Sequence, residues 1–459
     1  MKRMNVFSRL VRLLPVFISS VFLSWMFLPD ISSVDVDNQG LHSIPDYNDP
    51  CDERTPAFIF KLINVLNAVY YDKSRVEEIK LLNMGLRAIE AELRANGVPT
   101  EIPPLPDDTP VARGQYCFEG HFMAARRELF RLYPRWEATP DLGLAIGKRL
   151  LLEFGSSHTG LIPPKLYKHY SQDFDLGVIH YKRWGLLVAE KHDGSVSCVY
   201  VDRVAPASPA YEAGFRRFDL FLDSSGMRFV RSLGDLWDMI GDNQSVDVQV
   251  VRAGTRQLAG LHLPVVTWLD ENPCVISTAS REMGSHKFLS VAFHVFTPRA
   301  IVAMAERVNE MRPSGLVIDL RNNLGGFTDA LDSFWKMFLP SGTGTYTECP
   351  RNGEPLCNLV SSSDDPWRLP VVILVNENTS CGGELAAQIL LDNKRAFIVG
   401  VKTAGRTEMV DWNKAVKISE VTAVNVSNAA IKPAAGTVLE GRGGFPQYCV
   451  DLMFEDISA

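Results

Sequence analysis

The sequence predicts a multidomain α+β protein: a helical N-terminal region, a small β-domain and a C-terminal α/β core. Three observations support this fold class. Between residues 55 and 151, apolar residues recur every three or four positions, which is typical of amphipathic helices. From about 177 to 266, short alternating runs bounded by turn residues indicate strands. Beyond residue 270, apolar strands alternate with helical stretches, which predicts α/β layers around a largely parallel sheet.

The helical domain is assigned to residues 55–170. Within it, "RVEEIKLLNMGLRAIEAELRANGV" has helical periodicity and Gly97 is the expected stop. The Pro-rich stretch "VPTEIPPLPDDTPV" divides the region into two parts.

The β-domain is assigned to residues 175–266 and the α/β core to 270–459. In the β-domain, "WGLLVAEK", "VSCVYVDRV", "FDLFLDSSG" and "VDVQVVRAG" read as strands, and "APASPAYEAGF" as a short helix. In the core, "GLVIDL" and "PVVILVN" read as strands, and "PRAIVAMAERVNEM" and "GELAAQILLDN" as helices.

Composition narrows the functional classes. The chain has 459 residues, 46% of them apolar, which is enough for two to four domains. The net charge is −7, and there is no basic stripe with interleaved aromatic residues, so a nucleic-acid role has little support. We expect no cofactor and no bound metal.

The N-terminus has the layout of an export signal, because four basic residues precede the apolar run "LLPVFISSVFLSWMFL" (Lys2, Arg3, Arg9, Arg12). The run is short for a membrane span, which needs roughly 20 residues, and no small-x-small cleavage site follows it. Residues 1–30 are therefore either a cleaved signal peptide or an uncleaved membrane anchor, and 31–54 are a polar spacer. Either alternative predicts an exported protein, periplasmic or otherwise extracytoplasmic, soluble or anchored.

Eight cysteines suit an exported chain, in which disulfides persist. Cys349 and Cys357 flank a turn-rich loop that a disulfide could close. Five others allow too many pairings to choose among (Cys51, Cys117, Cys198, Cys274, Cys449). A catalytic Cys381 would have to stay unpaired.

Cys381 is the candidate nucleophile. In "PVVILVNENTSCGGELAAQILLDN", a buried strand runs into a tight turn with two glycines and then into a helix opened by Glu384. A helix N-terminus favours a thiolate and can bind an oxyanion, so we expect a lowered pKa for this thiol. The alternative is that Cys381 is a small buried apolar residue.

A second strand-to-loop crossing, "GLVIDLRNNLGG", places polar side chains beyond the strand end (Asp319, Arg321, Asn322, Asn323). Its Gly325–Gly326 pair could supply backbone N–H groups for an oxyanion hole. As a plain glycine turn it would have no catalytic meaning.

The general base has to come from elsewhere. Arg406 cannot accept a proton at working pH, although its charge could favour a thiolate. His158, in "LLEFGSSHTG", lies on the exit loop of a helix and is the candidate base. Its alternative role is that of a surface or capping residue.

The two crossings resemble the core of the carboxyl-terminal-processing (tail-specific) peptidases and their tricorn-type relatives. In an ungapped match, Cys381 falls on the family's nucleophilic serine, Arg406 on its lysine base and Val410 on its glutamine. The Ser-Lys-Gln arrangement is therefore absent. The resemblance implies a crotonase-like core of ββα type.

The tricorn-type arrangement matches better. There a histidine preceded by a serine, together with a later glutamate, assists the nucleophile; in this chain these positions are Ser157, His158 and Glu440. The resemblance implies a Cys381–His158–Glu440 site in which Ser157 helps to position the acid–histidine pair. It also implies an oxyanion hole formed by Gly382 together with Gly325 or Gly326.

The β-domain resembles a PDZ domain through "GLLVA" and "VDRVAPASPAYEAGFRRFDLFLDSSG". Such domains bind chain ends as an added strand, and here Gly185, Leu186 and Leu187 would form the loop that holds the terminal carboxylate. Phe218 and Ala207 stand where the family pattern often has glycine. The implied partners are protein or peptide substrates bound through their C-termini.

Several alternatives remain open from the sequence. The first is an active Cys-His-Glu peptidase; the second is an inactive pseudoprotease that binds peptide C-termini as a scaffold or regulator; the third is a binder of apolar ligands. A shift of one residue would make Ser380 the nucleophile, but adjacent side chains on a helix point about 100° apart, so only one of the two can face the oxyanion hole. Homo-oligomerisation and a regulatory role for the PDZ-like region are also open.

Overall fold

A computed structural model describes residues 55–133, 142–162, 184–193, 196–205, 208–240, 245–264, 276–361, 365–411, 415–419 and 422–451. The predicted signal or anchor (1–30) and spacer (31–54) lie outside these residues. Among the described helices, none has the length and apolarity needed to cross a membrane.

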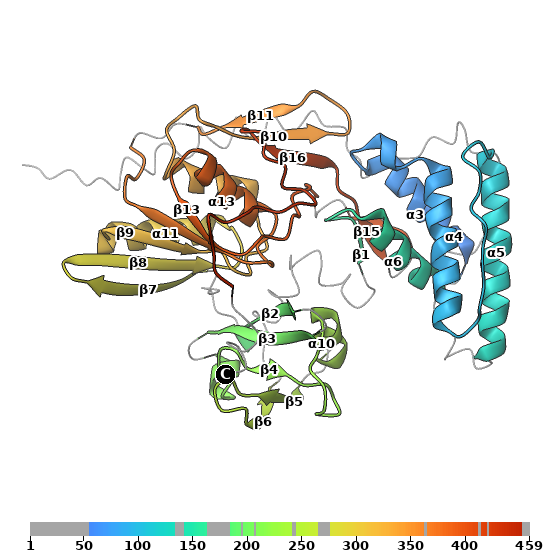
Figure 1. The fold of residues 1–459 in the computed structure, drawn as a ribbon, viewed down its shortest axis with the longest axis horizontal. Coiled ribbons are helices and arrows are strands. Elements are labelled where there is room, and N and C mark those ends of the chain that lie inside the picture. Colours follow the sequence, from blue (N-terminus) through green and yellow to red (C-terminus); the bar gives the residue numbers. More distant parts are fainter. Residues whose placement is uncertain are drawn as a thin grey trace, which may run out of the picture. The chain divides into compact units, whose positions relative to one another are not determined.

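The N-terminal region is helical, as predicted. It consists of α3 (Pro56–Val69), the 3₁₀ turn η2 (Lys73–Arg75), α4 (Glu78–Ala95), α5 (Val111–Leu132) and α6 (Leu142–Phe154), seen in Figure 1. Gly97 has φ +80 just beyond α4, so it ends that helix as expected. The Pro-rich stretch forms the link between α4 and α5.

Two short strands connect this helical region to the C-terminal part of the chain. β1 (Gly160–Ile162) pairs antiparallel with β15 (Ala423–Asn425), which also pairs with β14 (Val416–Lys417). Apolar residues from this sheet complete the helical core (Ile418, Val424, Val426). The loop that leaves α6 therefore lies against residues about 270 positions later in the chain, as in the 3.0 Å bond from the Ser427 N–H to Thr159 Oγ1.

The central region is a five-stranded antiparallel sheet in the order β2-β3-β4-β5-β6, with its own apolar core. Its elements are β2 (Leu186–Asp193), β3 (Val196–Val204), α9 (Pro209–Glu212), β4 (Leu220–Phe221), α10 (Leu233–Ile240), β5 (Val246–Val251) and β6 (Leu258–Leu263). Strand β2 is at an edge of this sheet. Phe218 has φ +69, a conformation that favours glycine.

The C-terminal region contains a six-stranded sheet in the order β17-β13-β12-β9-β8-β7. Its strands are β7 (Ile276–Met283), β8 (His286–Phe293), β9 (Gly315–Asp319), β12 (Val371–Val375), β13 (Phe397–Gly400) and β17 (Tyr448–Cys449). Only the β7–β8 pairing is antiparallel, so the expectation of a largely parallel sheet is confirmed. Three helices accompany it: α11 (Pro298–Met311), α12 (Thr328–Lys336) and α13 (Gly382–Asp392) (Figure 1).

A smaller sheet joins β10 (Gly344–Pro350), β11 (Leu356–Leu359) and β16 (Ala429–Pro433). Cys357 lies opposite Thr347 in this sheet, two positions from Cys349. Both thiols are free, so the suggested disulfide across this loop is wrong; strand register places the two cysteines out of line.

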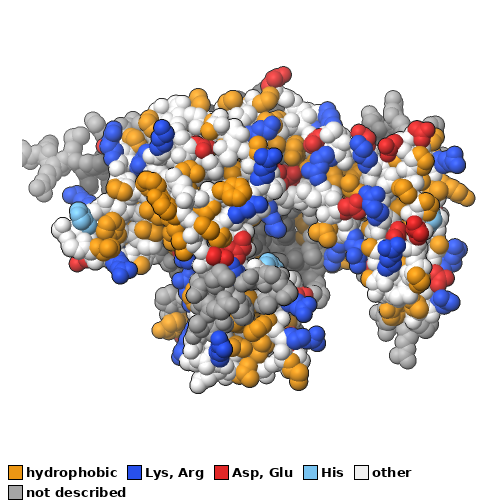
Figure 2. Space-filling view, in the orientation of Figure 1, with side chains coloured by type: hydrophobic (Ala, Val, Ile, Leu, Met, Phe, Trp, Pro, Cys, Tyr) orange, Lys and Arg blue, Asp and Glu red, His pale blue; other side chains and the backbone are white. Residues whose placement is uncertain are grey.

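The fold is a mixed α/β architecture of helices and several sheets, and this part of the prediction is confirmed. On the face shown in Figure 2, basic and acidic side chains are intermingled, in keeping with the modest net charge of −7. The domain boundaries, the crotonase-like detail and the PDZ assignment stay predictions.

Candidate active site

The turn between β12 and α13 presents Cys381 at the start of the helix. Cys381 is the N-cap residue, with φ +52 and ψ −122, a backbone conformation that L-residues rarely adopt. Its N–H donates to the carbonyl oxygen of Arg406 at 2.7 Å and to Glu384 Oε2 at 3.1 Å. The strained turn is therefore held by contacts on both sides.

Glu384, in the first turn of α13, holds the loop segment around Cys381 in place. Its side chain is 1% exposed and accepts the N–H groups of Gly405 at 2.7 Å and Arg406 at 2.8 Å, as well as the Thr403 hydroxyl. Burial raises the pKa of Glu384, and these donors oppose that rise. One carboxylate thus fastens the loop that carries Arg406 to the nucleophile turn.

The glycine loop after β9 lies directly against Cys381. The Gly325 N–H donates to Asn323 Oδ1 at 2.9 Å, whereas the N–H groups of Gly326 and Gly382 act on the Cys381 thiol and lower its pKa. A Cβ atom added to Gly325 would lie 2.7 Å from the Cys381 Cβ. Of the two glycines that the sequence left open, Gly326 is the one whose N–H reaches the sulfur.

The same contacts bear on the alternative nucleophile, Ser380. The Ser380 N–H donates to the Asn323 carbonyl oxygen at 2.8 Å, which ties its backbone to the glycine loop. It is the Cys381 side chain, one residue later, that the two glycine N–H groups reach. The geometry therefore favours Cys381 over Ser380.

The expected low pKa of the Cys381 thiol is wrong for this arrangement. Burial raises its pKa to about 11, and the nearby negative charges of Glu384 and Glu440 add to the rise. The two glycine N–H groups lower the pKa but do not outweigh burial. Arg406 reaches Cys381 through its backbone carbonyl, and its positive charge acts on His158 instead.

A measurement follows from the raised pKa. Alkylation of Cys381 by iodoacetamide, followed by peptide mass spectrometry, should be slow at pH 7 and should accelerate as the pH approaches about 11, because the thiolate is the reactive form. The exposed free thiol of Cys117 provides an internal reference in the same sample. A Cys381 rate that already reaches its plateau near pH 7 would contradict the protonated state of the thiol.

His158 belongs to a short relay on the loop after α6. Its Nδ1 lies 2.9 Å from the Ser157 hydroxyl oxygen, and the same hydroxyl acts to lower the pKa of Glu440. A Ser157 hydroxyl that donates to an ionised Glu440 accepts the Nδ1–H of His158, because a carboxylate only accepts. This leaves Nε2 as the unprotonated nitrogen, which is the one able to take a proton.

Glu440 is itself held in place. Its Oε2 accepts the Thr407 N–H at 2.6 Å and the Thr407 hydroxyl at 3.3 Å. Burial raises the pKa of Glu440. The structure thus brings together Ser157, His158 and Glu440, the three residues that the tricorn-type resemblance implied.

The histidine is neutral at physiological pH. Burial lowers the pKa of His158 to about 4; the charge of Glu408 acts to raise it, and that of Arg406 to lower it further. Within the described part of the chain, no hydrogen bond joins the His158 ring to the Cys381 sulfur. The resting site therefore holds a neutral thiol and a neutral imidazole, and not a preformed ion pair.

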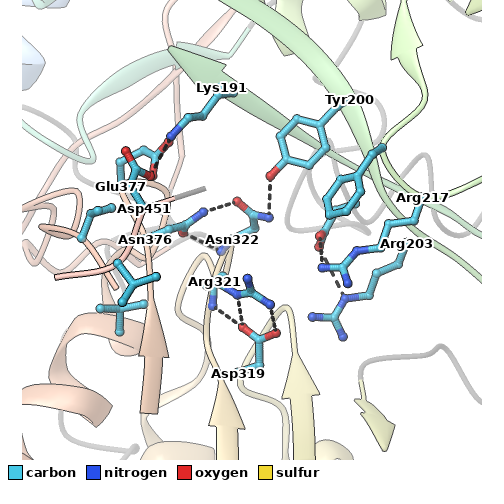
Figure 3. A pocket seen from close by; sticks show the side chains of 15 residues that line it. Lys191, Tyr200, Arg203, Arg217, Asp319, Arg321, Asn322, Asn376, Glu377 and Asp451 are labelled. Atoms are coloured by element: carbon cyan, nitrogen blue, oxygen red, sulfur yellow. Dashed lines mark hydrogen bonds and ion pairs between the residues drawn. The ribbon is translucent and has the colours of Figure 1, made fainter. Parts of the chain in front are cut away.

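A polar cavity of about 160 Å³ lies beside the glycine loop after β9 and the turn between β12 and α13, where the β2–β3 hairpin meets the C-terminal sheet (Figure 3). Its ionisable lining is balanced, with four basic and four acidic side chains (Lys191, Arg203, Arg217, Arg321; Asp202, Asp319, Glu377, Asp451). Such a lining is that of an ion-paired junction and not of a charged ligand site.

Three contacts at this junction join β2 and β3 to the glycine loop and to the turn before α13. Asn322 Nδ2 donates to the Tyr200 hydroxyl at 3.1 Å, and Lys191 Nζ lies 2.8 Å from Glu377 Oε1. Asn378 Nδ2 donates to the Glu190 carbonyl oxygen at 2.6 Å. Strand β3 therefore contacts the glycine loop through Asn322. Strand β2 contacts the turn before α13 through Glu377 and Asn378.

The proposed carboxylate loop lies at the start of edge strand β2. The carbonyl oxygen of Gly185 accepts the Ala205 N–H at 2.8 Å, and a Cβ atom at Gly185 would lie 2.3 Å from the Ser208 Cβ. Leu186 and Leu187 follow as the first, buried residues of the strand. Only glycine fits this close approach.

Across the described ranges, no group of three or more His, Cys, Asp or Glu side chains is placed to hold a metal ion.

Residues 289–449 match the sequence profile of peptidase family S41. This part of the chain is similar to peptidase family S41. The members of that family are peptidases, and thus hydrolases. The S41 region contains Cys381, Glu440 and the glycine loop, whereas His158 and Ser157 precede it.

Curated relatives show similarity to the same family of peptidases. The chain is 28% identical to a carboxyl-terminal-processing protease of Synechocystis sp. over 211 residues, 43% of this chain and 47% of that protein. It is 31% identical to carboxyl-terminal-processing peptidase 1 of Arabidopsis thaliana over 114 residues, 25% of this chain and 23% of that protein. Less than half the length of either relative is matched.

Among solved structures, the photosystem II D1 C-terminal processing protease aligns with a TM-score of 0.49 at 20% identity, covering 86% of this chain and 92% of that one. The tricorn protease aligns with a TM-score of 0.40 at 13% identity, covering 88% of this chain and 35% of that one.

Proposed function

We propose that the chain is a peptidase that hydrolyses peptide bonds of protein or peptide substrates with a Cys381–His158–Glu440 site. One observation carries the proposal: the glycine loop packs directly against Cys381 at a helix N-terminus, while the Ser157 hydroxyl lies 2.9 Å from the His158 ring and acts on Glu440. A nucleophile, two aligned N–H donors and an oriented base are the parts that acyl transfer requires.

The neutral resting state indicates how the reaction starts. As the sulfur attacks the carbonyl carbon, the thiol proton passes to Nε2 of His158, and the carbonyl oxygen becomes an oxyanion. The Gly326 and Gly382 N–H groups stabilise that oxyanion. Glu440, acting through the Ser157 hydroxyl, stabilises the imidazolium that forms.

The second half of the cycle returns the proton. The imidazolium gives its proton to the leaving amine as the C–N bond breaks, which leaves a thioester on Cys381. His158 then takes a proton from water, whose oxygen attacks the thioester. The C–S bond breaks, the acid product leaves, and the thiol regains its proton.

The proposal is tested by incubating the full chain with an unfolded protein substrate and identifying the products by mass spectrometry. New termini that appear with the wild type and are absent with Cys381→Ala would support it. If the wild type produces none while peptides still bind, the inactive pseudoprotease is the function that remains.

We further propose that the antiparallel β2–β6 region acts as a PDZ domain that binds substrate chain ends. Support comes from the position of β2 at a sheet edge and from the tight Gly185 turn that leads into it. An extended peptide could add to this edge as a further strand, with its carboxylate at the N–H groups of residues 185–187. Export through residues 1–30 completes the proposal.

The chain-end proposal predicts a preference for free carboxylates. Peptides with a free C-terminus should bind more tightly than the same peptides with a C-terminal amide, by about tenfold if one charge-assisted hydrogen bond is lost, measured by fluorescence anisotropy. A peptide blocked at its N-terminus is the matched control and should bind as before. Equal affinity for acid and amide would remove the chain-end role from this region.

A further inference from the structure

Glu408 is a buried carboxylate that the reaction outlined above does not use. Its side chain is 1% exposed, yet it accepts five hydrogen bonds. Oε1 accepts the hydroxyls of Tyr70 at 2.7 Å and Tyr71 at 3.1 Å. Oε2 accepts the Ser427 hydroxyl at 2.7 Å, the Ser157 N–H at 3.1 Å and the Ser156 hydroxyl.

These donors come from three separate parts of the chain. Tyr70 and Tyr71 follow α3, Ser156 and Ser157 follow α6, and Ser427 lies between β15 and β16. Burial acts to raise the pKa of Glu408, but the hydroxyl donors outweigh it and hold the pKa below its usual value, so the group is ionised at neutral pH. An ionised carboxylate with this many donors fixes all three segments at one point.

The segment that bears on chemistry is the loop of residues 156–158. Glu408 binds the backbone N–H of Ser157, while the Ser157 hydroxyl contacts His158 and Glu440. The carboxylate therefore holds the backbone from which the relay hydroxyl and the imidazole extend. Its charge also acts on the ring, favouring the protonated form.

We propose that Glu408 is a positioning residue for His158: it fixes the loop of residues 156–158 and supplies a negative charge that stabilises the imidazolium formed during turnover. The inference rests on the proposed peptidase function, and it assigns the histidine two carboxylates. Glu440 acts through the Ser157 side chain and Glu408 through the Ser157 backbone.

Charges of both signs act on His158. Glu408 favours the imidazolium and Arg406 opposes it, both from the loop that follows β13, while Glu440 is joined to the ring through Ser157. Tyr70 and Tyr71, the titratable groups from the end of α3, bind Glu408 and are neutral because burial raises their pKa values. Arg406 is exposed, so its charge can be removed without disturbing the buried network.

The charge is tested by NMR titration of ¹³C-labelled histidines, with the His158 signal assigned by its loss in His158→Asn. Arg406→Gln should raise the His158 pKa above about 4, because Glu408 is then unopposed, whereas Arg406→Lys keeps the charge and should titrate like the wild type. Adding Glu408→Gln to Arg406→Gln should lower the pKa again. No rise in Arg406→Gln, or no fall in a folded double variant, would overturn the proposal.

Kinetics separate positioning and charge from a merely structural role. Glu408→Gln should lower kcat about tenfold with KM nearly unchanged, since one pKa unit of the imidazolium corresponds to a factor of ten. Glu408→Asp keeps the charge and should recover part of the loss; if the role were only to fill space, the shorter Asp would be no better than Gln. Glu348→Gln, at a half-buried carboxylate on β10, is the matched control and should leave kcat unchanged.

The two proposals fail in different ways. A wild type that cleaves nothing would end the peptidase proposal, while the NMR series would still decide whether Glu408 controls the histidine. A wild type that cleaves, with a Glu408→Gln variant that is folded and fully active, would end the Glu408 proposal alone.

Discussion

Replacing Cys381 by alanine is expected to abolish peptide-bond cleavage, by roughly 10⁴-fold or more, while peptide binding persists. The sulfur is the atom that the Gly326 and Gly382 N–H groups reach, and alanine leaves no nucleophile there. His158→Ala should cost a comparable factor, because nucleophile and base act as a unit. The measurement is kcat/KM on a peptide substrate, with the free energy of unfolding checked in parallel.

Two further variants sharpen this result. Glu440→Gln should cost less than His158→Ala, since the carboxylate orients and stabilises the imidazole without accepting the proton. Cys381→Ser should lose most activity and retain a trace, because the same base can activate a hydroxyl less effectively at a site built around sulfur. Cleavage by Cys381→Ala at the wild-type rate would eliminate the thiol mechanism.

Gly325→Ala is expected to lower kcat/KM by roughly 10²- to 10³-fold, the cost of losing one oxyanion donor. The added Cβ would lie 2.7 Å from both the Cys381 Cβ and the Gly382 nitrogen, so the nucleophile and an N–H donor would have to move apart. The residue also has φ +97, which alone costs alanine about 1–3 kcal/mol. The loss should appear mainly in kcat, because the change lies at the nucleophile and its neighbouring N–H donor.

Gly342→Ala separates crowding from backbone strain. Gly342 has φ +80, similar to Gly325, but nothing lies within 4 Å of its added Cβ. The Gly342→Ala variant should lose about as much stability as Gly325→Ala and keep its peptidase activity. If both variants lose activity in proportion to stability, strain and not the approach to Cys381 is the cause.

Much of the local structure could be predicted from the sequence. The segment "PRAIVAMAERVNEM" forms α11 over the predicted residues, Gly97 follows the end of α4, and "GLVIDL" and "PVVILVN" contain neighbouring parallel strands. Periodicity, proline and glycine act within a few residues, so their effect is visible in a single stretch of chain. For the same reason Cys381 could be placed at a helix N-terminus before any coordinates were considered.

The state of that thiol could not be predicted in this way. The helix N-terminus suggested a lowered pKa, but burial and the charges of Glu384 and Glu440 raise it to about 11. The position of Cys381 in the sequence shows only that a helix dipole acts on its sulfur. The desolvation of the sulfur depends on which other parts of the chain pack around it.

The sequence by itself determined the residue types at the site: a thiol in a glycine turn, a histidine after a helix, and a distant glutamate. Only the tertiary structure decided that the Gly326 N–H, and not that of Gly325, reaches the sulfur, and that Glu408 binds hydroxyls up to 338 residues away in the chain. The physical reason is the distance along the chain over which each kind of interaction acts. Helix and strand patterns arise from neighbours in sequence, whereas hydrogen bonds and desolvation depend on groups that become neighbours only when the chain has folded.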